Sequence, residues 1–74
     1  MPHYRDGSEA RVGDIVKGPT YNKPGICVGV VCVVTPGAET CNLQVEAFMR
    51  KIGDTIIGAG GADYGEARAF DKVL

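Results

Sequence analysis

The chain has 74 residues, enough for one small domain, and 45% of them are hydrophobic while 23% are charged. Eight Lys and Arg stand against nine Asp and Glu, so the formal net charge is −1. That balance excludes a strongly basic protein that binds nucleic acid by phosphate neutralisation alone. The apolar content is too high for charge-driven disorder.

The longest apolar run, 26–34, is much shorter than the roughly 20 residues that cross a bilayer. No basic segment followed by an apolar stretch opens the chain, so we expect no signal peptide. We therefore expect a cytoplasmic protein without a membrane partner.

Eleven glycines and four prolines separate short β-branched runs, which is typical of a small all-β domain. In chain order, strands are expected at 11–17, 26–35, 40–49, 50–57 (bent at Gly53) and 66–74. The connections between them are 18–25, 36–39 and 58–65. The polar segment 1–9 is expected to form an arm or an edge strand. A short helical turn is expected near Asp71. No segment keeps a helical period for three turns.

The central hairpin predicts which side chains share a face. A four-residue loop at 36–39 pairs Thr35 with Thr40. Because successive side chains of a strand point to opposite faces, this pairing assigns each residue of the two strands to one face. The predicted core face contains Ile26, Val28, Val30, Cys32, Val34, Cys41, Leu43 and Val45. The predicted outer face contains Gly29, Val31, Val33, Asn42, Gln44 and Glu46. Its valines either raise β-propensity alone, or form a subunit interface or ligand floor. We expect self-association through Val31 and Val33.

The three cysteines form no C-x-x-C pair, and His3 is the single histidine, so a zinc site within one chain is not expected. All three lie in apolar runs, where a free Cys behaves as a small hydrophobe. We expect Cys32 and Cys41 on the core face, Cys27 on the other face and no disulfide.

The segment 12–31 reads V-G-D-I-V-K-G, a loop, then G-I-C-V-G-V-V. It resembles the KOW-type hairpin and, more broadly, the opening of SH3-like barrels. The resemblance implies a single SH3-like barrel of about five strands over 1–74. The loop 18–25 holds only Lys23, whereas nucleic-acid-binding KOW domains have a basic loop there. The segments 4–14 and 63–73 also resemble, in layout, small uncharacterised proteins of bacteriophages and other mobile elements.

The two glycine-rich connections carry the candidate ligand groups. The segment 58–65 has Asp63 where a dinucleotide-binding loop needs glycine, and it lacks the Lys-Ser/Thr pair of a P-loop. It is therefore interpreted as a mobile loop rather than a phosphate loop. The candidate residues for a small, anionic, partly planar ligand are Tyr21, Lys23, Asn42, Gln44, Tyr64 and Arg68. Tyr21 is equally well interpreted as a lid packed over one barrel end.

One histidine near a terminus does not support a base-and-orienter arrangement, so no catalytic residue is predicted. We expect a non-enzymatic homo-oligomer without a cofactor that holds a small nucleotide-type ligand between subunits. The resemblance in layout to phage proteins implies an accessory or counter-defence role, sequestering a nucleotide signal. The alternatives are an SH3-like adaptor for protein or, less favoured by charge, nucleic acid, and a small oligomeric enzyme with its site on a symmetry axis.

Overall fold

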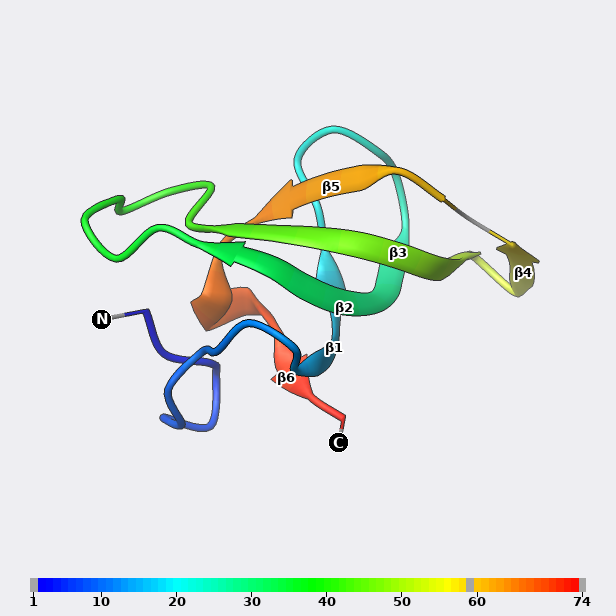
Figure 1. Ribbon diagram of the computed structural model, residues 1–74. Helices are drawn as coiled ribbons and strands as arrows, with labels where there is room; N and C mark the ends of the chain where they lie inside the picture. Colours follow the sequence, from blue (N-terminus) through cyan, green and yellow to red (C-terminus); the bar gives the residue numbers. More distant parts are fainter. Residues whose placement is uncertain (1, 59, 74) are drawn as a thin grey trace.

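A computed structural model describes residues 2–58 and 60–73. Its elements are β1 (Ile15–Pro19), β2 (Ile26–Val34), β3 (Leu43–Ile52), β4 (Thr55–Gly58), β5 (Ala62–Gly65), the 3-10 helix η1 (Ala67–Ala69) and β6 (Asp71–Lys72) (Figure 1). The all-β fold class predicted from the sequence is confirmed, with six strands instead of about five.

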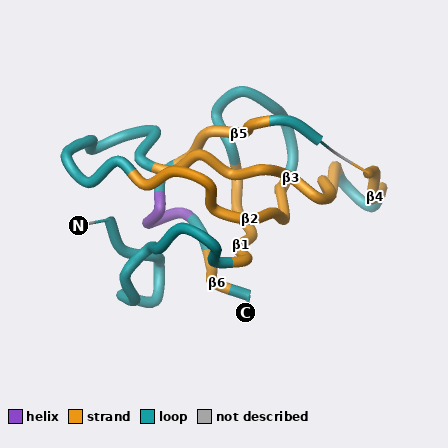
Figure 2. Tube along the Cα trace, in the orientation of Figure 1, coloured by secondary structure: helices purple, strands orange, loops and turns teal. Residues whose placement is uncertain are grey.

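All strand pairs are antiparallel, and the sheet order is β4-β3-β2-β1-β6. The strand β5 pairs with the first half of β3, while β4 pairs with its second half. From β5 the chain passes through η1 into β6, which returns to pair with β1 (Figure 2). The sheet therefore curls back toward its first strand and forms a small barrel-like fold.

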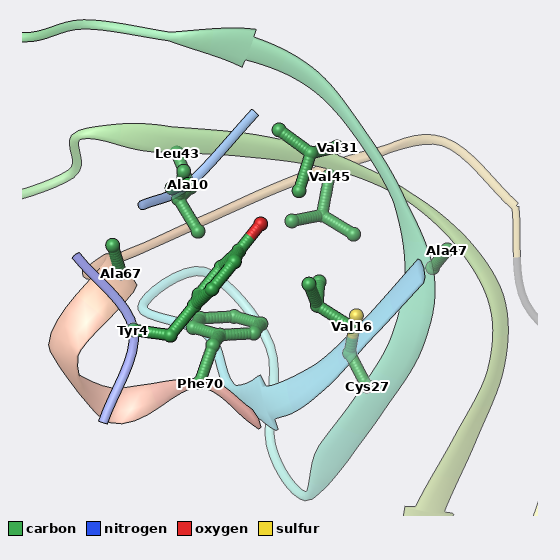
Figure 3. Packing of buried hydrophobic residues seen from close by; sticks show 10 residues of the cluster. All are labelled: Tyr4, Ala10, Val16, Cys27, Val31, Leu43, Val45, Ala47, Ala67 and Phe70. Carbon is green, nitrogen blue, oxygen red and sulfur yellow. The ribbon is translucent and has the colours of Figure 1, made fainter. Parts of the chain in front are cut away.

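The core is filled by ten buried side chains from the strands, the segment 67–70 and the N-terminal arm (Figure 3). Phe70 is its largest fully buried member. Its ring lies directly against two glycines, because a Cβ added at Gly18 or Gly65 would come within 2.7 or 2.5 Å of it. Those glycines let the backbones of β1 and β5 approach one aromatic ring, whose burial contributes about 1.5–3 kcal/mol.

The N-terminal arm closes one end of the barrel. Tyr4 is buried, and its hydroxyl donates to the Asp14 carboxylate at 2.7 Å, which also accepts from the Arg11 amide at 3.1 Å. Burial and the Asp14 carboxylate raise the pKa of Tyr4. Partial burial acts to raise the pKa of Asp14, but these hydrogen bonds and the Lys72 ammonium outweigh it and lower that pKa.

The strand expected at 11–17 therefore begins later than predicted. Residues 11–14 form a turn, with Gly13 at φ 96° and the Asp14 amide donating to the Arg11 carbonyl at 3.2 Å. The carboxylate of Asp14 holds this turn together, so β1 starts at Ile15. The expected strand at 50–57 is a hairpin instead, since β3 runs to Ile52 and turns at 53–54. The segment 66–74 is mostly η1 and the two-residue β6 within its described part.

The predicted register of the central hairpin is wrong, because its loop is longer than four residues. The Thr35 amide donates to the Asn42 carbonyl at 2.9 Å, so the loop closes eight residues and Val34 pairs with Leu43. A bulge between Val31 and Val33 then shifts the pairing, and Val31 lies opposite Val45. The predicted core face is therefore correct for Leu43 and Val45 on β3.

On β2 the predicted faces are inverted for most of the strand. Cys27, Gly29 and Val31 are buried, whereas Ile26 and Cys32 are exposed. The bulge restores the sidedness at the strand's end, where Val33 is exposed and Val34 packs against the core. Self-association through Val31 is consequently excluded, because this side chain is inside the barrel.

The two neighbouring valines give a matched test of the register. Val31 is 1% exposed and Val33 is 44% exposed. Val31→Lys places an unpaired charge in the core and should lower the free energy of unfolding by about 3–5 kcal/mol. Val33→Lys should change it by less than about 0.5 kcal/mol. Urea titrations followed by circular dichroism measure both, and equal effects would contradict the register.

The cysteines give a second test of sidedness. All three are free, with Cys27 buried and Cys32 and Cys41 exposed, so the predicted positions of all three are reversed. Burial also raises the pKa of the Cys27 thiol, which reduces its thiolate fraction. A thiol reagent should therefore modify two cysteines rapidly in the native protein and the third only after unfolding. Rapid reaction of all three in the native protein would place Cys27 at the surface.

Candidate functional site

The connection between β1 and β2 lies along β5 and brings two predicted site residues together. The Tyr21 amide donates to the Tyr64 carbonyl at 2.8 Å. The Asn22 side chain accepts from the Tyr64 amide and donates to the Ala62 carbonyl, both at 3.2 Å. The loop thus pairs with the edge of β5 almost as another strand would, and Tyr21 and Tyr64 become neighbours.

Four of the six predicted ligand residues form one surface, which we call the tyrosine patch: Tyr21, Gln44, Tyr64 and Arg68. Gln44 lies directly opposite Tyr64 in the β3–β5 pair. Glu66 lies close to the other two, since its carboxylate accepts from Arg68 at 2.8 Å and acts on the phenol of Tyr21. The Glu66 carboxylate raises the pKa of Tyr21 to about 12. Because Tyr21 is more than half exposed, it does not pack as a lid over the barrel end.

The other two predicted ligand residues are committed to the fold. The buried Asn42 side chain accepts from the Ala67 amide at 2.8 Å and donates to the Ala38 carbonyl at 3.3 Å. It therefore ties the loop 35–42 to η1. The Lys23 ammonium lies 3.2 Å from the buried carboxylate of Asp63. Neither group is free to hold a ligand.

A buried ion pair between Arg50 and Asp63 holds together the segments that carry the tyrosine patch. Both side chains are buried, and the guanidinium of Arg50 on β3 contacts the carboxylate of Asp63 on β5. Arg50 also donates to the Pro24 carbonyl at 3.0 Å and the Thr20 hydroxyl at 3.3 Å. One guanidinium thus joins β3, β5 and the connection 20–25. The sequence carried no signal of this, because Arg50 and Asp63 show no pattern that separates them from exposed charges.

Breaking this ion pair should destabilise the protein more than replacing it. Asp63→Asn leaves a buried guanidinium without its counter-charge, which costs about 3–5 kcal/mol in the free energy of unfolding. The double variant Arg50→Met with Asp63→Leu removes both charges and should recover part of that loss. The exposed pair Arg5–Asp71 is the control, because Asp71→Asn should cost no more than about 1 kcal/mol. Urea denaturation measures all three, and equal losses for Asp63→Asn and Asp71→Asn would contradict the assignment.

A groove of about 510 Å³ lies on the outer face of the sheet, over β1, β2, β3 and β4. Its apolar lining consists mainly of Ile26, Val28, Met49 and Ile56, and its charged lining of Arg5, Lys17, Lys51 and Asp71. The strand register explains this lining. One row of opposed residues joins Lys17, Val28 and Met49, and the next joins Ile26, Lys51 and Ile56.

The groove is lined by the two lysines of the described residues that have no carboxylate partner. Six of the eight Lys and Arg form ion pairs: Arg5, Arg11, Lys23, Arg50, Arg68 and Lys72. Over residues 2–58 and 60–73, Lys17 and Lys51 are the two cations without a carboxylate within 4.0 Å, and both line the groove. None of the six residues predicted from the sequence lines it.

The groove was missed because its residues come from separate strands. Its one sequence signal is a lysine on each of two separate strands, which becomes meaningful only when the register is known. The tyrosine patch has aromatic surface, but its Arg68 is neutralised by Glu66. For an anionic ligand, the groove is therefore the better candidate.

No family model, curated protein or solved structure matches this chain. In the part of the chain that the structure describes, no helix has the length and apolar character needed to cross a membrane. The same residues contain no group of three or more His, Cys, Asp or Glu side chains placed to hold a metal ion. The groove and the tyrosine patch are therefore the features that indicate a function.

Proposed function

We propose that this protein is a non-enzymatic binding protein whose groove holds a small nucleotide-type ligand, anionic at one end and apolar or planar at the other. One observation carries the proposal. Lys17 and Lys51, the two cations without carboxylate partners among the described residues, stand on either side of an apolar floor.

The geometry suits an anion held between two strands. Lys17 on β1 and Lys51 on β3 are separated by β2, so their Cα atoms are roughly 10 Å apart in the direction across the sheet. Their flexible side chains are long enough to reach one phosphate or carboxylate above Ile26. Each charge-assisted hydrogen bond contributes about 1.5–3 kcal/mol.

The remaining lining favours holding a ligand over transforming it. Met49 and Ile56 offer a flexible apolar surface beside the lysines, on which a planar ring can pack. The carboxylate in the described lining, Asp71, is engaged in two hydrogen bonds from Arg5, at 2.6 and 3.0 Å. A carboxylate held in this way is poorly placed to act as a general base. Retention of a nucleotide without turnover is what a sequestering role requires.

The tyrosine patch supports a second candidate function, an adaptor that binds another protein. Tyr21 and Tyr64 are neighbouring, exposed aromatic side chains with Gln44 beside them. Tyrosines are enriched where proteins bind one another, because they combine apolar area with a polar end. The two candidates use different surfaces and can be separated by mutation.

A ligand screen with lysine variants tests the proposed function. Mono-, di- and cyclic nucleotides that bind the native state should raise the melting temperature of the wild type. Lys17→Gln and Lys51→Gln should each weaken binding about tenfold, because each removes one charge-assisted contact. Arg11→Gln is the matched control, since Arg11 is exposed, paired with Glu9 and outside the groove lining.

Chemical-shift mapping with the same nucleotides identifies the surface that they contact. Shifts centred on Val28, Met49 and Lys51 are expected. A wild type that no nucleotide stabilises at millimolar concentration would refute the proposed function. Shifts confined to Tyr21 and Tyr64 would move the site to the tyrosine patch.

A further inference from the structure

The hairpin formed by the end of β3 and β4 projects from the barrel with its apolar side chains uncovered. In Figure 1, β4 lies at the far end of the long strand β3, away from β1 and β6. All four residues of β4 are exposed, and the exposed fractions are 65% for Ile56, 43% for Ile57 and 41% for Ile52. An apolar two-stranded hairpin is marginally stable in water by itself.

β4 also presents an open edge for hydrogen bonding. It pairs with β3 on one side and stands at the end of the sheet order. Ile52 and Thr55 face each other across the turn at 53–54, so pairing alternates outward from them. The amides of Ile56 and Gly58 consequently point away from β3.

β4 has only four residues, but it carries no charge, proline or bulge along its edge. Natural edge strands carry charges, prolines or bulges that prevent association with another strand. The strand Thr55–Gly58 reads T-I-I-G and pairs with β3 without a register shift. The flanking Lys51 and Asp54 have opposite charges, so two such hairpins carry no net repulsion.

We propose that two copies of this chain associate through β4, antiparallel and about a two-fold axis at Ile56, so that their sheets become one. A two-fold contact requires a self-complementary surface. This edge satisfies that requirement, because Ile56 would face the partner's Ile56 and both outward-pointing amides would find carbonyls. Self-association thus occurs at an edge that the sequence did not indicate, and not at Val31.

The available area sets the strength of this dimer. Pairing at the β4 edge covers only part of the exposed isoleucine surface, because Ile52 lies on β3 and Ile57 on the face opposite Ile56. Stable complexes bury about 1,200–2,000 Å² in total. The edge hydrogen bonds supplement the apolar term, and the dimer is therefore reversible, dissociating in the micromolar range or above.

Pairing at β4 also joins the two binding grooves. Ile56 is both an edge residue and part of the groove lining. Edge-to-edge pairing about this axis keeps both grooves on the same face of the joined sheet, so the lysines of both copies border one continuous trough. That the trough holds ligand rests on the proposed function, whereas the dimer itself does not require ligand.

Sedimentation velocity without ligand tests the dimer. The apparent mass of the wild type should rise with protein concentration from 7.8 kDa toward twice that value. Ile56→Lys and Ile56→Asp should each raise the dimer dissociation constant at least tenfold, because like charges then face each other across the axis. Val12→Lys is the matched control, since Val12 is also 65% exposed but outside the hairpin, and it should dimerise like the wild type.

Mixing the two charged variants tests the position of the axis. An equimolar mixture of Ile56→Lys and Ile56→Asp should restore association, because opposite charges then meet. Hydrogen exchange gives an independent readout, with the amides of Ile56 and Gly58 protected in the dimer and not in either single variant.

Each alternative outcome overturns the pairing. A wild type that remains monomeric at about 1 mM excludes it. A dimer that Ile56→Lys leaves intact, a mixture that fails to associate, or a mass above two chains places the contact elsewhere. Nucleotide binding by a wild type that remains monomeric would leave the proposed function standing while the pairing failed, and a wild-type dimer that no nucleotide stabilises would show the reverse.

Discussion

The buried contact between Arg50 and Asp63 is the interaction that holds β3, β5 and the connection 20–25 together. Arg50 lies on the longest strand and Asp63 on the short β5, and the guanidinium also holds the connection 20–25 through Pro24 and Thr20. A buried guanidinium needs a counter-charge and filled hydrogen-bond positions, so these segments must come together for the chain to fold. The tyrosine patch is assembled as a consequence.

The outer groove depends on the irregular pairing of β2 with β3. At the shift between Val28 and Gly29 the extra residue is Phe48 on β3, so Phe48 and Met49 are both exposed while Ala47 and Arg50 are buried. The second shift, between Val31 and Val33, returns Val34 to the core. Each bulge changes which neighbours face solvent, so a single strand serves both the core and the proposed binding surface.

The two candidate surfaces differ in charge. At the tyrosine patch, Arg68 is satisfied by Glu66 within the same segment, which leaves aromatic and amide groups for contact. In the groove, Lys17 and Lys51 have no such partner among the described residues, and apolar side chains lie between them. An unpaired ammonium beside an apolar floor gains most from a ligand that is itself both anionic and apolar.

The sequence by itself determined the all-β class and the inward positions of Leu43 and Val45, because these follow from local conformational preference and the period of two along a strand. The connection expected at 58–65 contains β5 instead, because Asp63 there is buried against Arg50. The sequence also indicated Tyr21, Gln44, Tyr64 and Arg68, which the fold does bring onto one surface, although Lys23 and Asn42 are used to hold loops. Tertiary structure alone decided the eight-residue loop 35–42, the bulges, the pairing of Arg50 with Asp63 and the meeting of Lys17 with Lys51 at one groove. The physical reason is that an inserted residue in one strand reverses every side chain beyond it, and this insertion is set by hydrogen bonds to distant segments rather than by the local residues.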